Sequence, residues 1–210
     1  MLRILVADDH PVVRLGLKEI ITKTPNMSVA GEAVNGQEVI DKVLANDYDV
    51  VLLDITMPGK VWLDVLSELR IKRPGLPVLV LSIHSEEEYA VRALRAGASG
   101  YLTKASTPNE LVEAIRRVSM HHKYISSCLS EKVIVALEVG IQKKLHESLS
   151  NREFEVMCMI ASGKTTSDIA KELVLSNTTI STYRARILEK MRVKSNAELT
   201  RYALQNSLIE

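Results

Sequence analysis

Apolar residues in the first 120 positions form short continuous runs, each followed by a stretch with helical spacing. Continuous runs of this length predict strands that are buried on both faces of a sheet. The five predicted strands are Leu2–Ala7, Met27–Ala33, Val50–Leu53, Pro77–Ile83 and Gly100–Thr103. Between them, apolar residues recur every three or four positions, which predicts helices. Five strand–helix repeats predict an α/β doubly wound parallel sheet with helices on both faces.

The alternation of strands and helices stops near residue 120, so we expect this first domain to span residues 1–120. Residues 121–148 are mostly polar and predict a linker, in which Ser130–Leu137 is compatible with a short amphipathic helix. From Leu149 onward the apolar pattern is helical throughout. Capping-box sequences at Ser150–Glu153 and Ser195–Glu198 mark the starts of two helices. Residues 149–210 therefore predict a second, smaller all-α domain.

Two helices of the second domain are predicted to lie close together in the chain. The first is Thr166–Leu173, and the second begins after Ser176 and runs to about Met191. A tight connection between two such helices predicts a helix-turn-helix, whose second helix enters the major groove of DNA. Its hydroxyl and arginine side chains suit phosphates and base edges. These candidate DNA-binding residues are Thr178, Thr179, Ser181, Thr182, Tyr183, Arg184 and Arg186. The alternative is an ordinary solvated helix face.

Charge supports this division only weakly. Residues 1–120 hold 14 Lys and Arg against 16 Asp and Glu, a net charge of −2. The remaining residues hold 13 against 10, a net charge of +3, and those from 149 onward hold nine against seven. An acidic first part and a mildly basic second part hint at a nucleic-acid partner for the second part.

Composition narrows the class of protein further. Aromatic residues make up 4% of the chain, so the core must be mainly aliphatic. No apolar run is long enough to cross a bilayer, and the N-terminus lacks signal-peptide architecture. Cys128 and Cys158 form no paired pattern and are expected to be reduced thiols. We therefore expect a cytoplasmic protein that does not contact membranes.

Polar residues follow the predicted strands at the points where these strands end. Asp8 and Asp9 follow the first strand, Asp54 the third, Ser82 ends the fourth, and Lys104 follows the fifth. The carboxyl ends of parallel strands meet at one edge of the sheet, where ligands of such folds bind.

Three acids at this edge repel one another, and Mg²⁺ would remove that cost because it prefers oxygen ligands. The cation, Lys104 and the Ser82 hydroxyl could then hold a phosphoryl group, with Asp54 as the nucleophile that forms an aspartyl phosphate. The alternative is that these acids only cap helices or face solvent.

This set of residues resembles the receiver domain of bacterial two-component response regulators. The resemblance covers residues 1 to about 120 and is carried by Asp8-Asp9, Asp54 followed by Met57-Pro58-Gly59, Ser82, and Tyr101-x-x-Lys104. It implies a five-stranded, flavodoxin-like receiver that accepts a phosphoryl group on Asp54 from a histidine kinase. Such a protein is not an enzyme in the usual sense, since it phosphorylates only itself and then slowly loses the group.

The resemblance also implies roles for individual residues. Mg²⁺ would be held by Asp9, Asp54 and the backbone carbonyl of Thr56, with Asp8 acting through water. Ser82 would swing toward the phosphoryl group and Tyr101 would follow it inward, which makes the pair a switch. We expect Thr56 and His84 to tune the lifetime of the phosphorylated state. His10, directly after the two acids, could suggest catalysis or metal binding, but we interpret it as a helix-start residue beside Pro11.

The second domain resembles the LuxR-type output domain of the NarL/FixJ subfamily, from residue 149 to about 207. Leu149-Ser150-x-Arg152-Glu153, Ile169-Ala170-x-x-Leu173, Leu175-Ser176 and Thr179-Ile180-Ser181-x-Tyr183 carry this resemblance. Many members have Val-Lys-x-His where this chain has Ile180-Ser181-Thr182-Tyr183. A lysine that often contacts DNA is therefore missing, which puts the target sequence in question but not the docking mode.

Together these features predict a phosphorylation-controlled transcription factor that dimerises when phosphorylated and binds paired half-sites in double-stranded DNA. One alternative is an interaction module that sequesters a protein and no longer reads DNA; its affinity for DNA would lack the steep salt dependence of phosphate contacts. A second alternative is a phosphatase with an aspartyl intermediate, which would show multiple turnover on a phosphoester.

The loop after Asp54 departs from the receiver pattern at Val61-Trp62, where many receivers have a polar residue and then a glycine. Trp62 is the single tryptophan of the chain. It can be a helix-start residue that packs on the surface. The alternative is that its indole lies along the rim of the phosphorylation site and reports on it by fluorescence.

Overall fold

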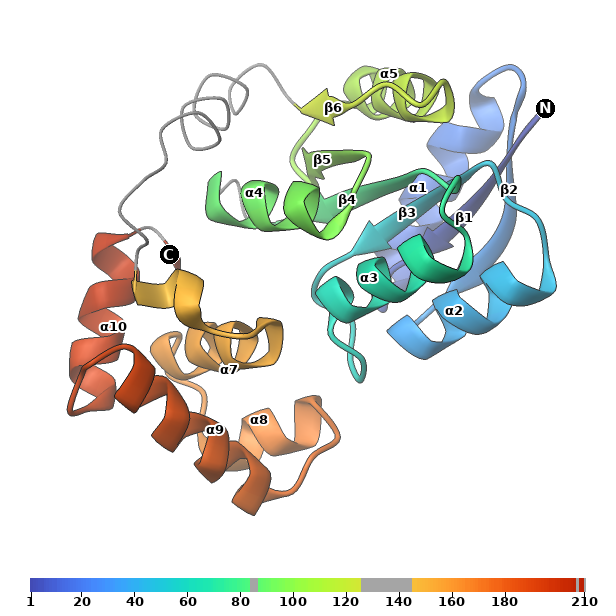
Figure 1. The fold of residues 1–210 in the computed structure, drawn as a ribbon. Coiled ribbons are helices and arrows are strands. Elements are labelled where there is room, and N and C mark those ends of the chain that lie inside the picture. Colours follow the sequence, from blue (N-terminus) through green and yellow to red (C-terminus); the bar gives the residue numbers. More distant parts are fainter. Residues whose placement is uncertain (84–86, 126–144, 207, 210) are drawn as a thin grey trace. The chain divides into compact units, whose positions relative to one another are not determined.

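The computed structural model describes residues 1–83, 87–125, 145–206 and 208–209 (Figure 1). The chain divides into two compact units, Met1–Leu137 and Glu138–Glu210. The predicted helix at 130–137 and Cys128 lie outside the described residues. Within the described residues, no helix combines the length and the apolar character that crossing a membrane requires.

The first unit alternates strands and helices and forms one parallel sheet. Its elements are β1 Leu2–Ala7, α1 Pro11–Lys23, β2 Met27–Ala33, α2 Gly36–Ala45, β3 Val50–Asp54, α3 Trp62–Lys72, β4 Val78–Ser82, α4 Glu87–Ala96, β5 Gly100–Thr103, α5 Pro108–Ser119 and β6 Tyr124–Ile125. The strand order is β2-β1-β3-β4-β5-β6. The chain reverses its direction of winding between β1 and β3, which makes the sheet doubly wound, as predicted.

The helices cover both faces of this sheet. α1 and α5 lie on one face, and α2, α3 and α4 lie on the other (Figure 1). Every residue of β3 and β4 is buried, because helices cover these central strands on both sides. The aliphatic runs found in the sequence therefore form the core of the first unit.

The sheet has one strand more than predicted. Tyr124 and Ile125, which the sequence places in a polar linker, pair in parallel with Gly100 and Tyr101. Gly100 permits this approach, since a Cβ at this position would lie 2.7 Å from the Tyr124 carbonyl oxygen. A strand of two residues has no detectable periodicity, so the prediction of five strands was wrong by one.

The second unit is all-α, as predicted. Its elements are the 3-10 helix η1 Leu145–Ser148, α7 Asn151–Ala161, α8 Thr166–Glu172, α9 Asn177–Lys190 and α10 Asn196–Gln205 (Figure 1). Ser150 and Glu153 form the predicted capping box of α7. At α10, the Ser195 hydroxyl accepts a hydrogen bond from the backbone amide of Glu198 and so caps the helix. The Glu198 carboxylate accepts from the backbone amide of Lys194, whereas a capping box would require the amide of Ser195.

The start of the second unit is more ordered than its sequence indicates. Residues 145–148 belong to the stretch predicted to be a polar tether, yet they form η1, and His146 is fully buried. The Nδ1 atom of His146 lies 2.9 Å from the Tyr202 hydroxyl of α10. This contact attaches η1 to the helical core, and it depends on a partner 56 residues away in the sequence.

Candidate functional site

The carboxyl-terminal edge of the first sheet holds an acidic cluster. Asp8 follows β1 and Asp54 ends β3, and these neighbouring parallel strands bring both side chains to the same edge. Both carboxylates are fully buried, whereas Asp9 is 31% exposed. Asp8, Asp9, His10 and Asp54 each place one ligand atom within 4.8 Å of the others. The convergence predicted from the strand ends is therefore present.

Lys104, which follows β5, joins this cluster. Its Nζ lies 2.7 Å from Oδ2 of Asp8 and 3.0 Å from Oδ2 of Asp54. Its backbone amide donates to the Ser82 carbonyl oxygen at 2.6 Å, which ties the loop after β5 to the end of β4. Burial lowers the pKa of Lys104, but the hydrogen bond to Asp8 and the charge of Asp54 outweigh it and raise the pKa above its usual value. Lys104 is therefore a fixed positive charge.

Asp54 is held in an environment that disfavours its charge. Burial is the main reason that its pKa is raised, and the charge of Asp8 adds to the effect. The hydroxyl of Thr56, which donates to Oδ2 of Asp54 at 2.7 Å, and the charge of Lys104 lower the pKa but do not cancel the rise. A carboxylate in this environment is stabilised when a further positive charge or a covalent bond compensates its negative charge.

The second oxygen of Asp54 supports a cation-binding role. Across the described part of the chain, no donor reaches Oδ1 of Asp54, although this atom is buried. Buried polar atoms nearly always have a partner, so an oxygen without one calls for a ligand. Three carboxylates in one cluster are oxygen ligands of the kind that Mg²⁺ prefers. The residues therefore fit a divalent cation.

The two predicted switch residues are buried close to this edge. Ser82 is the last residue of β4 and Tyr101 lies on β5, and neither side chain is exposed. In the register of the two strands, Ser82 pairs with Thr103, two residues beyond Tyr101. The aromatic ring therefore already occupies an inward position. His84, the second predicted tuning residue, lies outside the described residues.

Trp62 is the first residue of α3 and is 6% exposed. It follows Val61, which occupies the N-cap position without a capping side chain. The helix-start interpretation is confirmed, but the side chain is buried where surface packing was expected. The hypothesis that the indole reports on the acidic edge stays a prediction, which fluorescence during Mg²⁺ titration would test.

His10 joins this edge, although its sequence context favoured a helix-start role over metal binding. It does begin α1 at the N-cap position, but its side chain makes no capping hydrogen bond. Its Nδ1 lies 2.8 Å from Oδ1 of Asp9 and 3.3 Å from Oδ1 of Asp8. The signal in the sequence was its position directly after two acids, which alone could not show where the ring points.

The predicted DNA-binding helix is α9, and the structure divides the seven candidate residues by exposure. Thr178, Ser181, Thr182 and Arg186 are exposed, whereas Thr179, Tyr183 and Arg184 are half-buried. The Arg184 side chain donates to Oδ1 of Asn196 at 2.7 Å, which ties it to α10. The exposed positions recur every three or four residues and lie on one side of the helix, opposite the buried Ile180 and Ile187.

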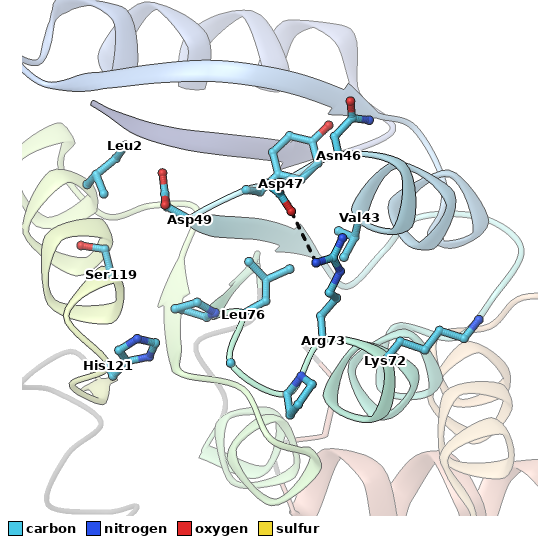
Figure 2. A pocket seen from close by; sticks show the side chains of 14 residues that line it. Leu2, Val43, Asn46, Asp47, Asp49, Lys72, Arg73, Leu76, Ser119 and His121 are labelled. Atoms are coloured by element: carbon cyan, nitrogen blue, oxygen red, sulfur yellow. Dashed lines mark ion pairs between the residues drawn. The ribbon is translucent and has the colours of Figure 1, made fainter.

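A hollow of about 400 Å³ lies at the opposite, amino-terminal edge of the sheet (Figure 2). Its lining includes Leu2 at the start of β1, Asp49 before β3 and Leu76 before β4. Arg73 and Asp47 form an ion pair across it at 3.4 Å (Figure 2). It is remote from the acidic edge, and its mixed charges define no chemistry comparable to that of Asp54 and Lys104.

A doubly wound sheet with this acid–lysine edge, in a chain that also carries a helix-turn-helix unit, defines a receiver-type regulator. Residues 4–116 match the response regulator receiver domain family, and residues 147–203 match the bacterial regulatory proteins of the luxR family. The chain belongs to the two-component response regulators of the NarL/FixJ, LuxR-type subfamily.

Relatives match over nearly the whole length of both chains. The response regulator UvrY of Escherichia coli O6:H1 is 33% identical over 209 residues, which are 99% of this chain and 96% of UvrY. The response regulator GacA of Pseudomonas protegens is 34% identical over 210 residues, covering 100% of this chain and 99% of GacA. A structure of the RcsB response regulator of Salmonella typhimurium has a TM-score of 0.75 at 24% identity and covers 98% of each chain, a likeness of fold.

Proposed function

We propose that this response regulator accepts a phosphoryl group on Asp54 from a sensor histidine kinase and thereby controls DNA binding by its second unit. The observation that carries the proposal is the buried Asp54, with Lys104 at 3.0 Å on one oxygen and no donor on the other within the described residues. A phosphorylation site needs both features, a fixed positive charge and room for a further ligand.

The chemistry follows from the position of Asp54. An Asp54 oxygen attacks phosphorus, the bond from phosphorus to the kinase histidine nitrogen breaks, and that nitrogen takes up the electron pair. Asp8, Asp9, Asp54 and the Thr56 carbonyl would hold Mg²⁺, which neutralises charge on the phosphoryl oxygens when bound. Lys104 contributes a second positive charge, and its contact with Asp8 keeps Nζ at the edge where the phosphoryl group arrives.

The switch role of Ser82 and Tyr101 is part of the proposal. Ser82 is buried at the end of β4, and the Lys104 amide binds its carbonyl oxygen. A phosphoryl group on Asp54 would accept a hydrogen bond from the Ser82 hydroxyl, and Tyr101 would then be held inward. Thr56, which contacts Asp54 in this structure, and His84 would set how long the phosphoryl group persists.

The second unit is proposed to bind paired half-sites in double-stranded DNA as a homodimer formed on phosphorylation. The exposed hydroxyls and Arg186 on one side of α9 support this, because such groups suit phosphates and base edges. One of the solved relatives, RcsB of Salmonella enterica, is described as bound to promoter rprA in the presence of a phosphomimetic. The partners proposed for this chain, a sensor histidine kinase and DNA, would place it in the cytoplasm.

The test uses the full chain with an acyl phosphate donor and Mg²⁺. We expect a mass gain of one phosphoryl group in the wild type and none in Asp54→Asn. DNA selected in vitro with and without donor then serves for binding assays, in which only the wild type should bind more tightly after phosphorylation. Equal DNA binding by both proteins, treated or untreated, would rule out control by phosphate.

A further inference from the structure

His10 occupies a position in the acidic edge that helix capping does not explain. Its backbone amide donates to Oδ1 of Asp8 at 2.8 Å, which fixes the start of α1 against the acid pair. Its side chain caps no backbone group of α1. The ring is turned instead toward the carboxylates of Asp8 and Asp9. This orientation, and not the helix start alone, requires a reason.

The spacing of the atoms around His10 resembles that of ligands around one cation. Nδ1 lies 2.8 Å from Oδ1 of Asp9 and 3.3 Å from Oδ1 of Asp8. Two neighbouring ligands at about 2.1 Å from a metal and at right angles are separated by about 3.0 Å. One ligand atom from each of Asp8, Asp9, His10 and Asp54 lies within 4.8 Å of the others, so small movements would bring all four to one ion.

A protonated imidazole paired with the acids would show similar distances, so the distances alone do not decide. The independent observation is Oδ1 of Asp54, which is buried and has no donor among the described residues. An ion pair between His10 and the other two acids leaves this oxygen without a partner. A cation in the middle of the cluster supplies one.

We propose that His10 is a fourth ligand, through which this edge takes a borderline first-row divalent cation, of the class of Co²⁺ and Zn²⁺, besides Mg²⁺. Imidazole nitrogen binds such ions well, whereas Mg²⁺ prefers oxygen. The inference rests on the proposed function because it uses the same three carboxylates. A cation bound in this way uses the carboxylates proposed for Mg²⁺ and therefore competes with Mg²⁺ for the edge.

The test compares affinities for two metals in untagged, metal-free, full-length protein by titration calorimetry. His10→Ala should weaken Co²⁺ binding at least about tenfold and should change Mg²⁺ binding by less than about twofold. The visible absorption of bound Co²⁺ should change in the same variant, because one nitrogen ligand is lost. His122→Ala, a substitution of an exposed histidine in the same unit, is the matched control and should change neither affinity.

Each other outcome has a defined meaning. Equal Co²⁺ affinity in the wild type and His10→Ala overturns the inference. Tighter binding of both metals by His10→Ala also overturns it, because loss of a counter-ion would have that effect. Asp9→Asn separates the two proposals: if it leaves Mg²⁺ affinity unchanged, the proposed magnesium site fails. If it weakens Mg²⁺ but His10→Ala leaves Co²⁺ unchanged, only the role of His10 fails.

Discussion

Two buried carboxylates, one in each unit, differ in how their charge is compensated. Glu153 in α7 is 3% exposed, and its Oε2 accepts from the Ser150 amide at 2.7 Å and from Lys190 Nζ at 2.6 Å. Burial raises the pKa of Glu153, but the hydrogen bonds from Lys190 and Ser150 outweigh it, and the pKa is lowered. Asp54 is fully buried, and its pKa is raised.

The difference separates a carboxylate that stabilises the fold from one that is kept ready for chemistry. The charge of Glu153 is matched by donors that belong to the same unit, so its ionised form stabilises the folded state. The charge of Asp54 is shared with a second buried acid, Asp8, and one of its oxygens has no donor within the described residues. Perturbed groups of this second kind cluster at functional sites. The following predictions are ordered by the size of the expected effect, and all but the one on the backbone of Val174 test this comparison.

Lys104→Met should have the largest effect. It leaves two buried carboxylates without the cation that contacts both, and it should lower the free energy of unfolding of the first unit by about 3 kcal/mol. Millimolar Mg²⁺ should restore part of the loss. Urea unfolding followed by circular dichroism measures both. Lys18→Met, at an exposed ion pair with Glu32, is the control and should cost at most about 1 kcal/mol. Equal losses in the two variants would contradict the prediction.

The same change from carboxylate to amide should have opposite effects in the two units. Glu153→Gln should lower the free energy of unfolding of the second unit by about 2 kcal/mol, because it weakens a buried charge-assisted contact and a helix cap. Asp54→Asn should leave the free energy of unfolding of the first unit unchanged or raise it by up to about 1 kcal/mol, because it removes repulsion from Asp8. Denaturant titrations of both variants and the wild type measure this. Destabilisation by both substitutions would remove the distinction.

A backbone prediction concerns the turn of the second unit. Val174, between α8 and α9, has a φ of +53° and is 76% exposed, so its side chain gains little from burial. A β-branched residue is strained in this left-handed region, and Val174→Gly should raise the free energy of unfolding by about 1 kcal/mol. Val34→Gly, at a partly exposed valine whose φ is not positive, should lower it. Thermal melts that moved in the same direction for both would argue against strain.

The dependence on pH should distinguish the two carboxylates by sign. The raised pKa of Asp54 means that its ionisation destabilises the folded state, so the gain from Asp54→Asn should be full at neutral pH. It should shrink as the pH falls through the raised pKa toward the ordinary value of 3.8. The lowered pKa of Glu153 means that its contribution is full above the ordinary value of 4.5 and is lost as the pH falls through the lowered pKa.

Melting curves from neutral pH down to about pH 3 measure both dependences. The stabilisation by Asp54→Asn and the destabilisation by Glu153→Gln should each diminish on acidification, the first beginning at higher pH. A gain from Asp54→Asn that grows as the pH falls would show that the pKa of Asp54 is lowered instead.

Much of the fold was predictable because it follows from local patterns. The apolar runs of the first unit set its strands, and hydroxyl residues such as Ser150 and Ser195 mark helix starts by local hydrogen bonds. Even the acidic edge was predictable, since parallel strands necessarily carry Asp8 and Asp54 to the same end of the sheet. The seven candidate residues of α9 were predictable as a helix, but their division into exposed and half-buried was not.

The sequence by itself determined the class of each unit, the sheet edge on which the acids gather and the helix that carries the hydroxyls. Periodicity and topology rules depend only on neighbouring residues and on strand direction, so these features follow from the sequence alone. Only the tertiary structure decided that β6 pairs with Gly100, that His146 binds Tyr202, and that the ring of His10 turns to the acids. It also decided that the pKa of Asp54 is raised and that of Glu153 is lowered, because burial and partner distances depend on residues that lie far apart in the sequence.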